Sequence, residues 1–291
     1  MQEITGELNR RIAALAADRT TGASGILSKT LEILTAARAA DIDLLPVAEA
    51  LCLAQPTMAS VWNASAAALS DNPDRLTQFA ERVRRAPAAI ARYAATLFSD
   101  DASERPLHVV TVSCSGSVVV AIKAIRAARA VRVSCSESRP ALEGRRLAAE
   151  LAATGIPVTY FSDAAIASAL STADAAVPHA TGGPDVVLVG ADAIAATWFL
   201  NKAGTRMLAA AATQQGVPVY VVASRDKFVG RDLAARLVIR SGEPAEVWGS
   251  PPEGVDVRNP YFELIPLDLV SAVISDAGIL GTGMVPDVCE H

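Results

Sequence analysis

The chain has 291 residues, of which about half are apolar and a fifth are charged, with a formal net charge of −5 at pH 7. This length and composition fit a globular protein of one large or two modest domains. The acidic balance offers no basic surface for a nucleic-acid backbone, and no apolar run reaches the roughly 18 residues that span a bilayer. We therefore expect neither a nucleic-acid partner nor a membrane partner.

Charge order and cysteine spacing indicate the cellular setting. The N-terminal sequence MQEITGELNRRIAALAADRT mixes acidic and basic residues and lacks the basic-then-apolar order of a signal peptide. The cysteines Cys52, Cys114, Cys135 and Cys289 show no CxxC spacing and are too few for a disulfide framework. With no HExxH motif either, the sequence predicts a cytoplasmic protein with reduced thiols and no bound metal.

Residues 1–104 are predicted to form a helical domain. Alanine and leucine recur at helical spacing in residues 7–17, 25–40 and 76–98. Prolines are expected to separate the helical segments. They stand at positions 46, 56, 73 and 87. The polar, proline-ended stretch 99–106 is the predicted boundary.

Residues 105–291 are predicted to form an α/β domain. Strand-like runs alternate with helical patterns, which is typical of right-handed βαβ units and a parallel sheet covered on both faces. The expected strands are 107–112, 131–135, 157–161, 186–189, 217–222 and 261–265. The expected helices are 118–130, 142–153, 164–176, 201–214 and 267–275.

Ligands of open parallel sheets bind beyond the carboxyl ends of the strands, so the turns after the strands are the candidate sites. The first turn, 113–117, has small residues that leave backbone N–H groups accessible to a phosphate at a helix N-terminus. The same position is expected to lower the pKa of the Cys114 thiol. The alternative is a small buried cysteine in a tight turn.

Two further turns carry polar residues. In the second, Arg139 could bind a phosphate with two hydrogen bonds, or could instead be a surface arginine paired with Glu137 or Glu143. In the third, Ser162 and Asp163 have the pattern of a helix N-cap, which is a structural role.

The fourth turn holds the strongest polar group. Asp192 follows a buried strand, where loss of hydration can raise the pKa of a carboxyl group into the range of a general acid. Asn201 and Lys202 are expected to open the next helix, where an amide and an ammonium group could meet an anion. Alternatively, Asp192 caps the turn or pairs with Lys202.

Several catalytic motifs are missing from the sequence. No GxGxxG follows a strand and no GxxxxGK[ST] occurs, which argues against a nicotinamide oxidoreductase. A Ser-His-Asp triad has no GxSxG support.

Four segments in order along the chain resemble one known family. They are TGASGIL (21–27), ESRPALEGRRLAAELAATGIPVTYFSD (137–163), GADAIAATWFLNKAGTRMLAAAATQQGVPVYVVASRDKF (190–228) and NPYFELIPLDLVSAVISDAGIL (259–280). The family unites methylthioribose-1-phosphate isomerases, ribose-1,5-bisphosphate isomerases, and the α, β and δ regulatory subunits of eukaryotic initiation factor 2B. The resemblance implies an N-terminal helical domain, a Rossmann-like domain, a homodimer and no cofactor.

The resemblance also implies roles for individual residues. Cys114 and Asp192 stand where the isomerases have their catalytic cysteine and aspartate. The residues expected to bind substrate are Gly22, Ala23, Ser24, Ser115, Gly116, Ser117, Arg139, Asn201 and Lys202. Three stretches differ from the usual isomerase pattern and leave the substrate open: Thr21 in place of an arginine, Ser113 and Ser115 around the cysteine, and residues 196–198 in place of Asn-Gly-Asp.

The function that follows is an aldose–ketose isomerase acting on a ribose-type sugar 1-phosphate. Asp192 would protonate the ring oxygen as general acid, and Cys114 would move a proton from C2 to C1. The alternative is a non-catalytic protein that senses a sugar phosphate or nucleotide, as the α subunit of initiation factor 2B does.

Overall fold

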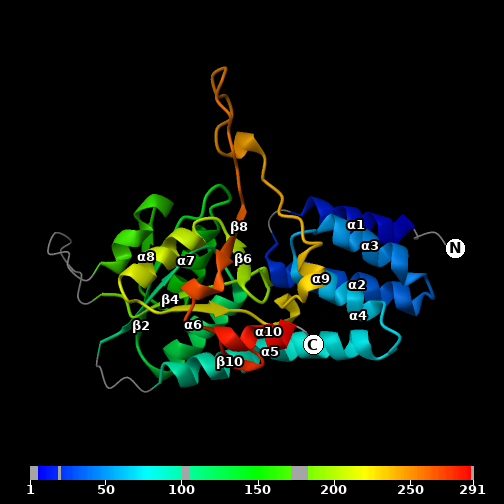
Figure 1. Ribbon diagram of the computed structural model, residues 1–291, viewed down its shortest axis with the longest axis horizontal. Coiled ribbons are helices and arrows are strands. Elements are labelled where there is room, and N and C mark those ends of the chain that lie inside the picture. The colour runs from blue at the N-terminus through cyan, green and yellow to red at the C-terminus, as the bar shows by residue number, and fades with distance from the viewer. Residues whose placement is uncertain (1–5, 19–20, 100–104, 172–182, 290–291) are drawn as a thin grey trace.

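The computed structural model describes residues 6–18, 21–99, 105–171 and 183–289. A group of helices and a helix-covered sheet lie side by side along the long axis of the molecule (Figure 1). The predicted fold class, α/β with N-terminal helices before a mostly parallel sheet, is confirmed. The division into domains 1–104 and 105–291 stays a prediction, because residues 100–104 lie outside the described part.

The N-terminal helices share one apolar core. They are α1 (Gly6–Ala17), α2 (Ala23–Ala39), α3 (Leu44–Ala54), α4 (Ala59–Ala68) and α5 (Arg75–Leu97). The core includes Leu15, Ile33 and Leu51, as the helical spacing of apolar residues predicts. The expectation that every proline separates helices is wrong for Pro87, which lies inside α5.

Helix α5 connects the two parts of the molecule. Phe79 near its start packs in the helical core, whereas Ile90 and Ala94 pack with the residues of the sheet. Figure 1 shows this helix running along one edge of both parts. Burial at both ends explains how one long helix accommodates an internal proline.

Seven strands form the main sheet in the order β10-β9-β7-β4-β1-β2-β3. They are β1 (Leu107–Thr111), β2 (Val131–Ser136), β3 (Val158–Phe161), β4 (Val186–Val189), β7 (Val219–Val222), β9 (Ala272–Ser275) and β10 (Gly278–Gly281). All neighbours are parallel except β9 and β10. The chain winds to one side from β1 and to the other from β4, and ligands of such sheets bind where the winding reverses.

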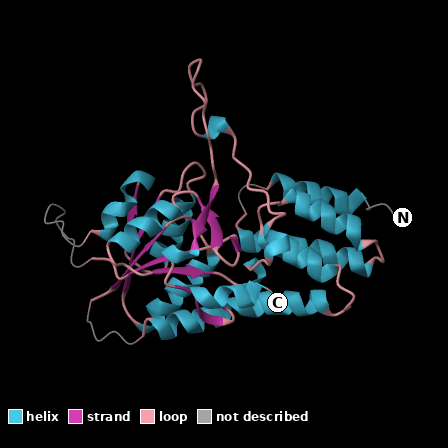
Figure 2. Cartoon of the chain, viewed as in Figure 1, coloured by secondary structure: helices cyan, strands magenta, loops and turns pink. Residues whose placement is uncertain are grey.

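Other elements cover or extend this sheet. The main helices are α6 (Gly116–Ala128), α7 (Glu143–Ala153) and α8 (Thr205–Gln214), and the short ones are α9 (Arg231–Ala234) and α10 (Val285–Cys289). A second, antiparallel sheet consists of β5 (Ala193–Ile194), β6 (Trp198–Lys202) and β8 (Phe262–Pro266). The segment 235–261, here called the arm, is mostly loop and projects from the body (Figure 2).

Three predicted helices differ from the structure. The helix expected at 201–214 begins at Thr205, because residues 198–202 form β6 and pair with β8. Residues 267–275 form a 3₁₀ turn and strand β9, because the β-branched Val273 and Ile274 are buried beside β7. The segment 164–176 is a 3₁₀ helix, η1 (Asp163–Leu170), and residues 172–176 lie outside the described part.

Candidate active site

A cavity of about 510 Å³ lies beyond the carboxyl ends of β1 and β4, where the winding of the sheet reverses. The first residues of α2 and part of the arm complete its wall. Most of the predicted site residues line it: Gly22, Ala23, Ser24, Cys114, Ser115, Gly116, Asp192, Asn201 and Lys202. Ser117 and Arg139 are not among the described lining residues, and Arg139 is exposed.

The loops behind the cavity are tied together by side chains. The Ser138 hydroxyl accepts a hydrogen bond from the Ser113 amide, and the Asp163 carboxylate accepts two, from the amides of Ser138 and Arg139. Asp163, predicted as a helix cap, therefore joins the turns after β2 and β3. Ser113 has φ 64°, an uncommon conformation for a residue other than glycine, next to the candidate cysteine.

Cys114 lies in the turn between β1 and α6, and its thiol is partly buried. The expected lowering of its pKa by the helix N-terminus is not found. Burial raises the pKa of the Cys114 thiol, and Arg146 opposes this shift. The physical reason is that loss of hydration destabilises the thiolate by more than the nearby positive charge stabilises it.

Asp192 lies in the turn that follows β4, the strand next to β1 in the sheet. Its amide donates to the Leu200 carbonyl at 2.7 Å, and its carbonyl accepts from the Ala59 amide at the start of α4. Burial raises the pKa of the Asp192 carboxyl, and the largest opposing influence is the positive charge of Lys227. The expected direction of this shift is confirmed, and it favours a carboxyl group that keeps its proton.

Asn201 and Lys202 reach the cavity from β6. Asn201 is 6 % exposed and donates to the Thr205 hydroxyl. Lys202 is 3 % exposed, pairs with Glu143 at 3.0 Å and lies 4.4 Å from the centre of the Tyr261 ring. A strand paired on both sides holds these two side chains more firmly than a helix start would.

Two helix N-termini meet at the cavity. Gly22 caps α2, so the amides of Ala23 and Ser24 lie in its first turn, where an N–H has no acceptor within the helix. A Cβ built on Gly116, the first residue of α6, would lie only 3.7 Å from the Ser24 hydroxyl oxygen. The positive ends of both helices therefore face one space, which favours an anion.

The lining residues that were not predicted include four with polar or aromatic side chains beside the candidate groups: Arg146, Lys227, Glu143 and Tyr261. Lys227 is 7 % exposed, and its positive charge acts on the Asp192 carboxyl group. Its position, just after β7, follows the same rule about strand ends that identified Cys114 and Asp192. Arg146 lies on α7, one turn after Glu143, and no strand-end rule could find it.

Other chemistry was also sought in the described part of the chain. There, no group of three or more His, Cys, Asp or Glu side chains is arranged to hold a metal ion. No helix in that part is long and apolar enough to cross a bilayer.

A sequence model of the Initiation factor 2 subunit family matches residues 6–282. The chain belongs to this family. One relative is a methylthioribose-1-phosphate isomerase from Syntrophotalea carbinolica, 32 % identical over 270 residues, which cover 87 % of this chain and 74 % of that protein. Another is a 5-deoxyribose 1-phosphate isomerase from Moorella thermoacetica, 34 % identical over 160 residues, covering 52 % of this chain and 43 % of that protein.

Solved structures of other proteins share the fold. A translation initiation factor eIF-2B from Pyrococcus horikoshii OT3 has a TM-score of 0.78 at 24 % identity, covering 95 % of this chain and 98 % of that one. The 5-methylthioribose 1-phosphate isomerase from the same organism has a TM-score of 0.65 at 22 % identity, covering 97 % and 86 %. The fold is thus common to proteins named as enzymes and to proteins named as initiation factors.

Proposed function

We propose that this protein is an aldose–ketose isomerase of a ribose-type sugar 1-phosphate. The observation that carries the proposal is that a thiol and a buried carboxyl group line one cavity, together with basic side chains and two helix N-termini. The relatives named methylthioribose-1-phosphate isomerase and 5-deoxyribose 1-phosphate isomerase support the same reaction class.

Asp192 acts as the general acid. The phosphate on C1 locks an aldose 1-phosphate as a ring, so the ring must open before the carbonyl group can move. Asp192 gives its proton to the ring oxygen, and the bond between that oxygen and C1 breaks. The raised pKa supports this role, because the carboxyl group keeps a proton to give.

Cys114 acts as the base that carries a proton between carbons. Its thiolate takes the proton from C2 and returns it to C1, while the C2 hydroxyl proton leaves to the Asp192 carboxylate and the C2 carbonyl forms. Because burial raises the pKa of this thiol, the thiolate is a minor form of the empty site. Arg146, whose charge lowers that pKa, is the group that stabilises the thiolate.

The charges of the cavity favour a substrate with a single phosphate. Among the described lining residues, four are basic (Arg146, Lys202, Lys227, Arg240) and six are acidic (Asp18, Glu143, Glu150, Asp192, Glu243, Glu246). Glu143 also has a buried carboxylate oxygen without a hydrogen-bond partner. Asn201, Lys202, Lys227 and the α2 N-terminus bind the phosphate, and the acidic side accepts hydrogen bonds from sugar hydroxyls. This balance favours a methylthioribose-type 1-phosphate over ribose 1,5-bisphosphate.

A substrate screen tests the proposal. The purified protein is incubated with methylthioribose 1-phosphate, 5-deoxyribose 1-phosphate and ribose 1,5-bisphosphate, and ketose formation is followed. We expect turnover with the single-phosphate sugars and Cys114→Ser to abolish it, because a hydroxyl group is a far weaker base than a thiolate. Cys52→Ser is the matched control, since Cys52 lies in α3, outside the cavity lining.

The alternative function makes a different prediction. A regulatory protein of the initiation-factor type would bind a sugar phosphate or nucleotide tightly without converting it. Saturable binding with no ketose formed by the wild-type protein would establish that alternative. We further propose that the protein is a cytoplasmic homodimer that needs no cofactor.

A further inference from the structure

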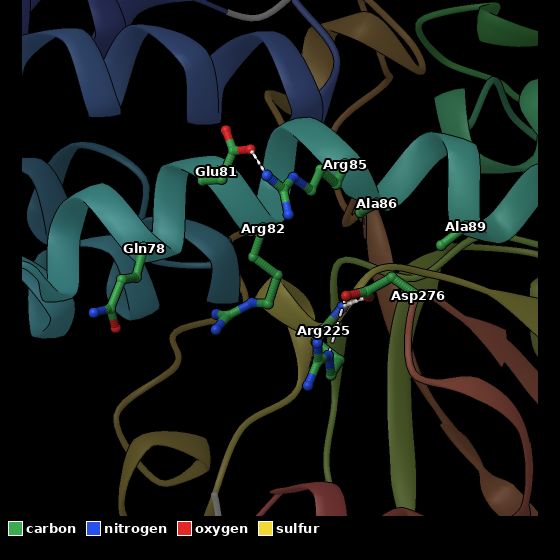
Figure 3. Close-up of a pocket in the computed structure, with 8 residues that line it drawn as sticks. All are labelled: Gln78, Glu81, Arg82, Arg85, Ala86, Ala89, Arg225 and Asp276. Atoms are coloured by element: carbon green, nitrogen blue, oxygen red, sulfur yellow. Dashed lines mark hydrogen bonds and ion pairs between the residues drawn. The ribbon is translucent and has the colours of Figure 1, made fainter.

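A second pocket, of about 430 Å³, lies between α5 and the turn after β7, away from the cavity described above. It shares no lining residue with that cavity. Its walls carry three arginines: Arg82 and Arg85 from α5, and Arg225 from the 3₁₀ turn η2 (Arg225–Lys227). Figure 3 shows Arg82 and Gln78 reaching down from α5, with Arg225 and Asp276 on the opposite wall.

The acidic residues of this pocket are already paired. Glu81 accepts hydrogen bonds from Arg84 and forms a further ion pair with Arg85. Asp276 accepts from both the backbone amide and the Nε of Arg225, at 2.7 and 3.0 Å. In the described part of the chain, neither carboxylate forms a hydrogen bond or an ion pair with Arg82.

Arg82 is therefore a positive charge that no carboxylate hydrogen-bonds in the described part of the chain. Its Nε is buried and has no hydrogen-bond partner among the described residues, although its guanidinium lies 5.0 Å from the centre of the Phe79 ring. Burial lowers the pKa of Arg82, the positive charge of Arg225 lowers it further, and Asp276 and Asp226 oppose both. An unpaired buried donor costs free energy that a bound anion would recover.

Arg225 offers the second half of an anion site. Asp276 fixes the guanidinium through Nε, and the two terminal nitrogens have no hydrogen-bond partner in the described part of the chain. Such a side chain is held in one orientation and still has donors to give. Two guanidinium groups that face one space are suited to a phosphate. Its oxygens can accept hydrogen bonds from both groups, and its negative charge can balance both positive charges.

We propose that the pocket between α5 and η2 binds the phosphate group of a small molecule, held between Arg82 and Arg225. Its volume lies at the lower end of the range for small-molecule sites, which fits inorganic phosphate or a compact phosphate monoester. A carboxylate is less suited, because it has two oxygens and one charge for two guanidinium groups.

The test uses the full chain with Lys202→Gln and Lys227→Gln, which weaken phosphate binding in the other cavity. Inorganic phosphate is titrated while the Arg Nε–Hε resonances are followed by NMR. We expect saturable shifts of the Arg82 and Arg225 signals, and a loss of affinity of about tenfold or more in Arg82→Gln. Arg82→Lys keeps the positive charge but loses the paired N–H donors of the guanidinium group. Its affinity for phosphate should therefore lie between those of the wild-type and Arg82→Gln proteins.

Arg92→Gln is the matched control, because it removes the same charge from the same helix at an exposed position outside the pocket. Equal weakening by Arg92→Gln and Arg82→Gln would overturn the proposal in favour of a general charge effect. So would unchanged affinity in a folded Arg82→Gln protein, or citrate binding as tightly as phosphate. If ribose 5-phosphate binds more tightly than inorganic phosphate, the site is one for phosphate monoesters. If inorganic phosphate binds more tightly, the site is one for the free anion.

Discussion

Burial acts on Asp192 and Cys114 in the same direction and has opposite consequences for them. It raises the pKa of both groups, which keeps a proton on the carboxyl group and also on the thiol. An acid gains from this shift, whereas a base loses. At neutral pH the productive state, with Asp192 protonated and Cys114 ionised, is therefore a minor form.

Asp192→Asn tests the acid at this residue. Removing a group that acts in the transition state should lower kcat by about 10²–10⁴-fold with little change in substrate affinity. The fall of the rate at alkaline pH should also disappear, because the side-chain amide that replaces the Asp192 carboxyl group cannot lose a proton there. The measurement is the dependence of kcat on pH in both proteins.

A structural role for Asp192 would give another result. Asparagine caps a turn as well as aspartate does, so a cap would survive the substitution. A fully active Asp192→Asn protein would show that the carboxyl group has no part in catalysis and would favour the sensor function.

His108 gives the chain a sensitivity to acid that is unrelated to catalysis. It is 5 % exposed in β1, with Nε2 at 2.8 Å from the Ser134 hydroxyl. Burial lowers the pKa of His108 from 6.5 to about 4, with Arg132 adding to the effect. The unfolded chain therefore takes up a proton at a higher pH than the folded chain does, and stability falls as the pH drops from 6.5 towards 4.

His108→Gln should remove this loss. The depressed pKa corresponds to about 3 kcal/mol of unfolding free energy between the two pH limits. Urea unfolding at several pH values between 7 and 4.5 compares the two proteins. Parallel losses in both would assign the acid sensitivity to other groups.

At the scale of elements, the approach of β4 to α6 depends on one glycine. A Cβ built on Gly190 would lie 2.6 Å from the side-chain carbon and oxygen of Ser115, the N-cap residue of α6. The turns that carry Cys114 and Asp192 can come this close only because position 190 has no side chain.

Gly190→Ala should therefore push apart the turns that carry Cys114 and Asp192. We expect a loss of stability of about 1–3 kcal/mol, as for overpacked cores, and a larger loss of activity. Ser115→Gly removes both clashing atoms, so the double variant should regain much of the stability lost by Gly190→Ala. Thermal unfolding of the single and double variants measures this, and additive losses would show that the two residues do not clash.

The order of the elements could be predicted from sequence wherever local pattern and final packing agree. The helices α1, α2 and α5 and the strands β1, β2 and β4 show spacings that match their burial. The local sequence pattern gave wrong predictions where pairing with a distant strand decides the secondary structure. Residues 198–202 become a strand because β8, some sixty residues later, pairs with them, and residues 272–275 do so beside β7.

The candidate site was predictable for a related reason. Cys114 and Asp192 follow strands that read clearly as buried apolar runs, so their place at the edge of the sheet could be inferred. Arg146 and Tyr261 line the same cavity from a helix face and from the end of the arm. Only the packing of α7 and the path of the arm bring them there, and neither leaves a signal in local sequence.

At the scale of the whole molecule, the arm carries apolar side chains that the rest of the chain does not cover. It projects from the body and exposes apolar side chains, among them Val247, Trp248 and Val255 at 50, 50 and 44 %. Exposed apolar side chains on a projecting segment indicate contact with another protein surface. The expected homodimer would cover them.

Trp248→Glu should weaken that dimer. Light scattering at micromolar concentrations should give a dimer mass for the wild-type chain and a mass shifted towards the monomer for the variant. Glu253→Gln, an exposed polar change on the same arm, serves as the control. A wild-type monomer would remove the arm as a dimer contact.

The cavity draws its walls from both parts of the molecule, with Gly22 to Ser24 on one side and the turns after β1 and β4 on the other. A ligand bound in the cavity contacts both the helical part and the sheet part, and so holds the two together while it is bound. At a hundred times its dissociation constant it would stabilise the folded chain by about 2.7 kcal/mol. Amides of α2 should then gain protection from hydrogen exchange together with those of α6, so that two segments some ninety residues apart open as one unit only when the sugar phosphate is bound.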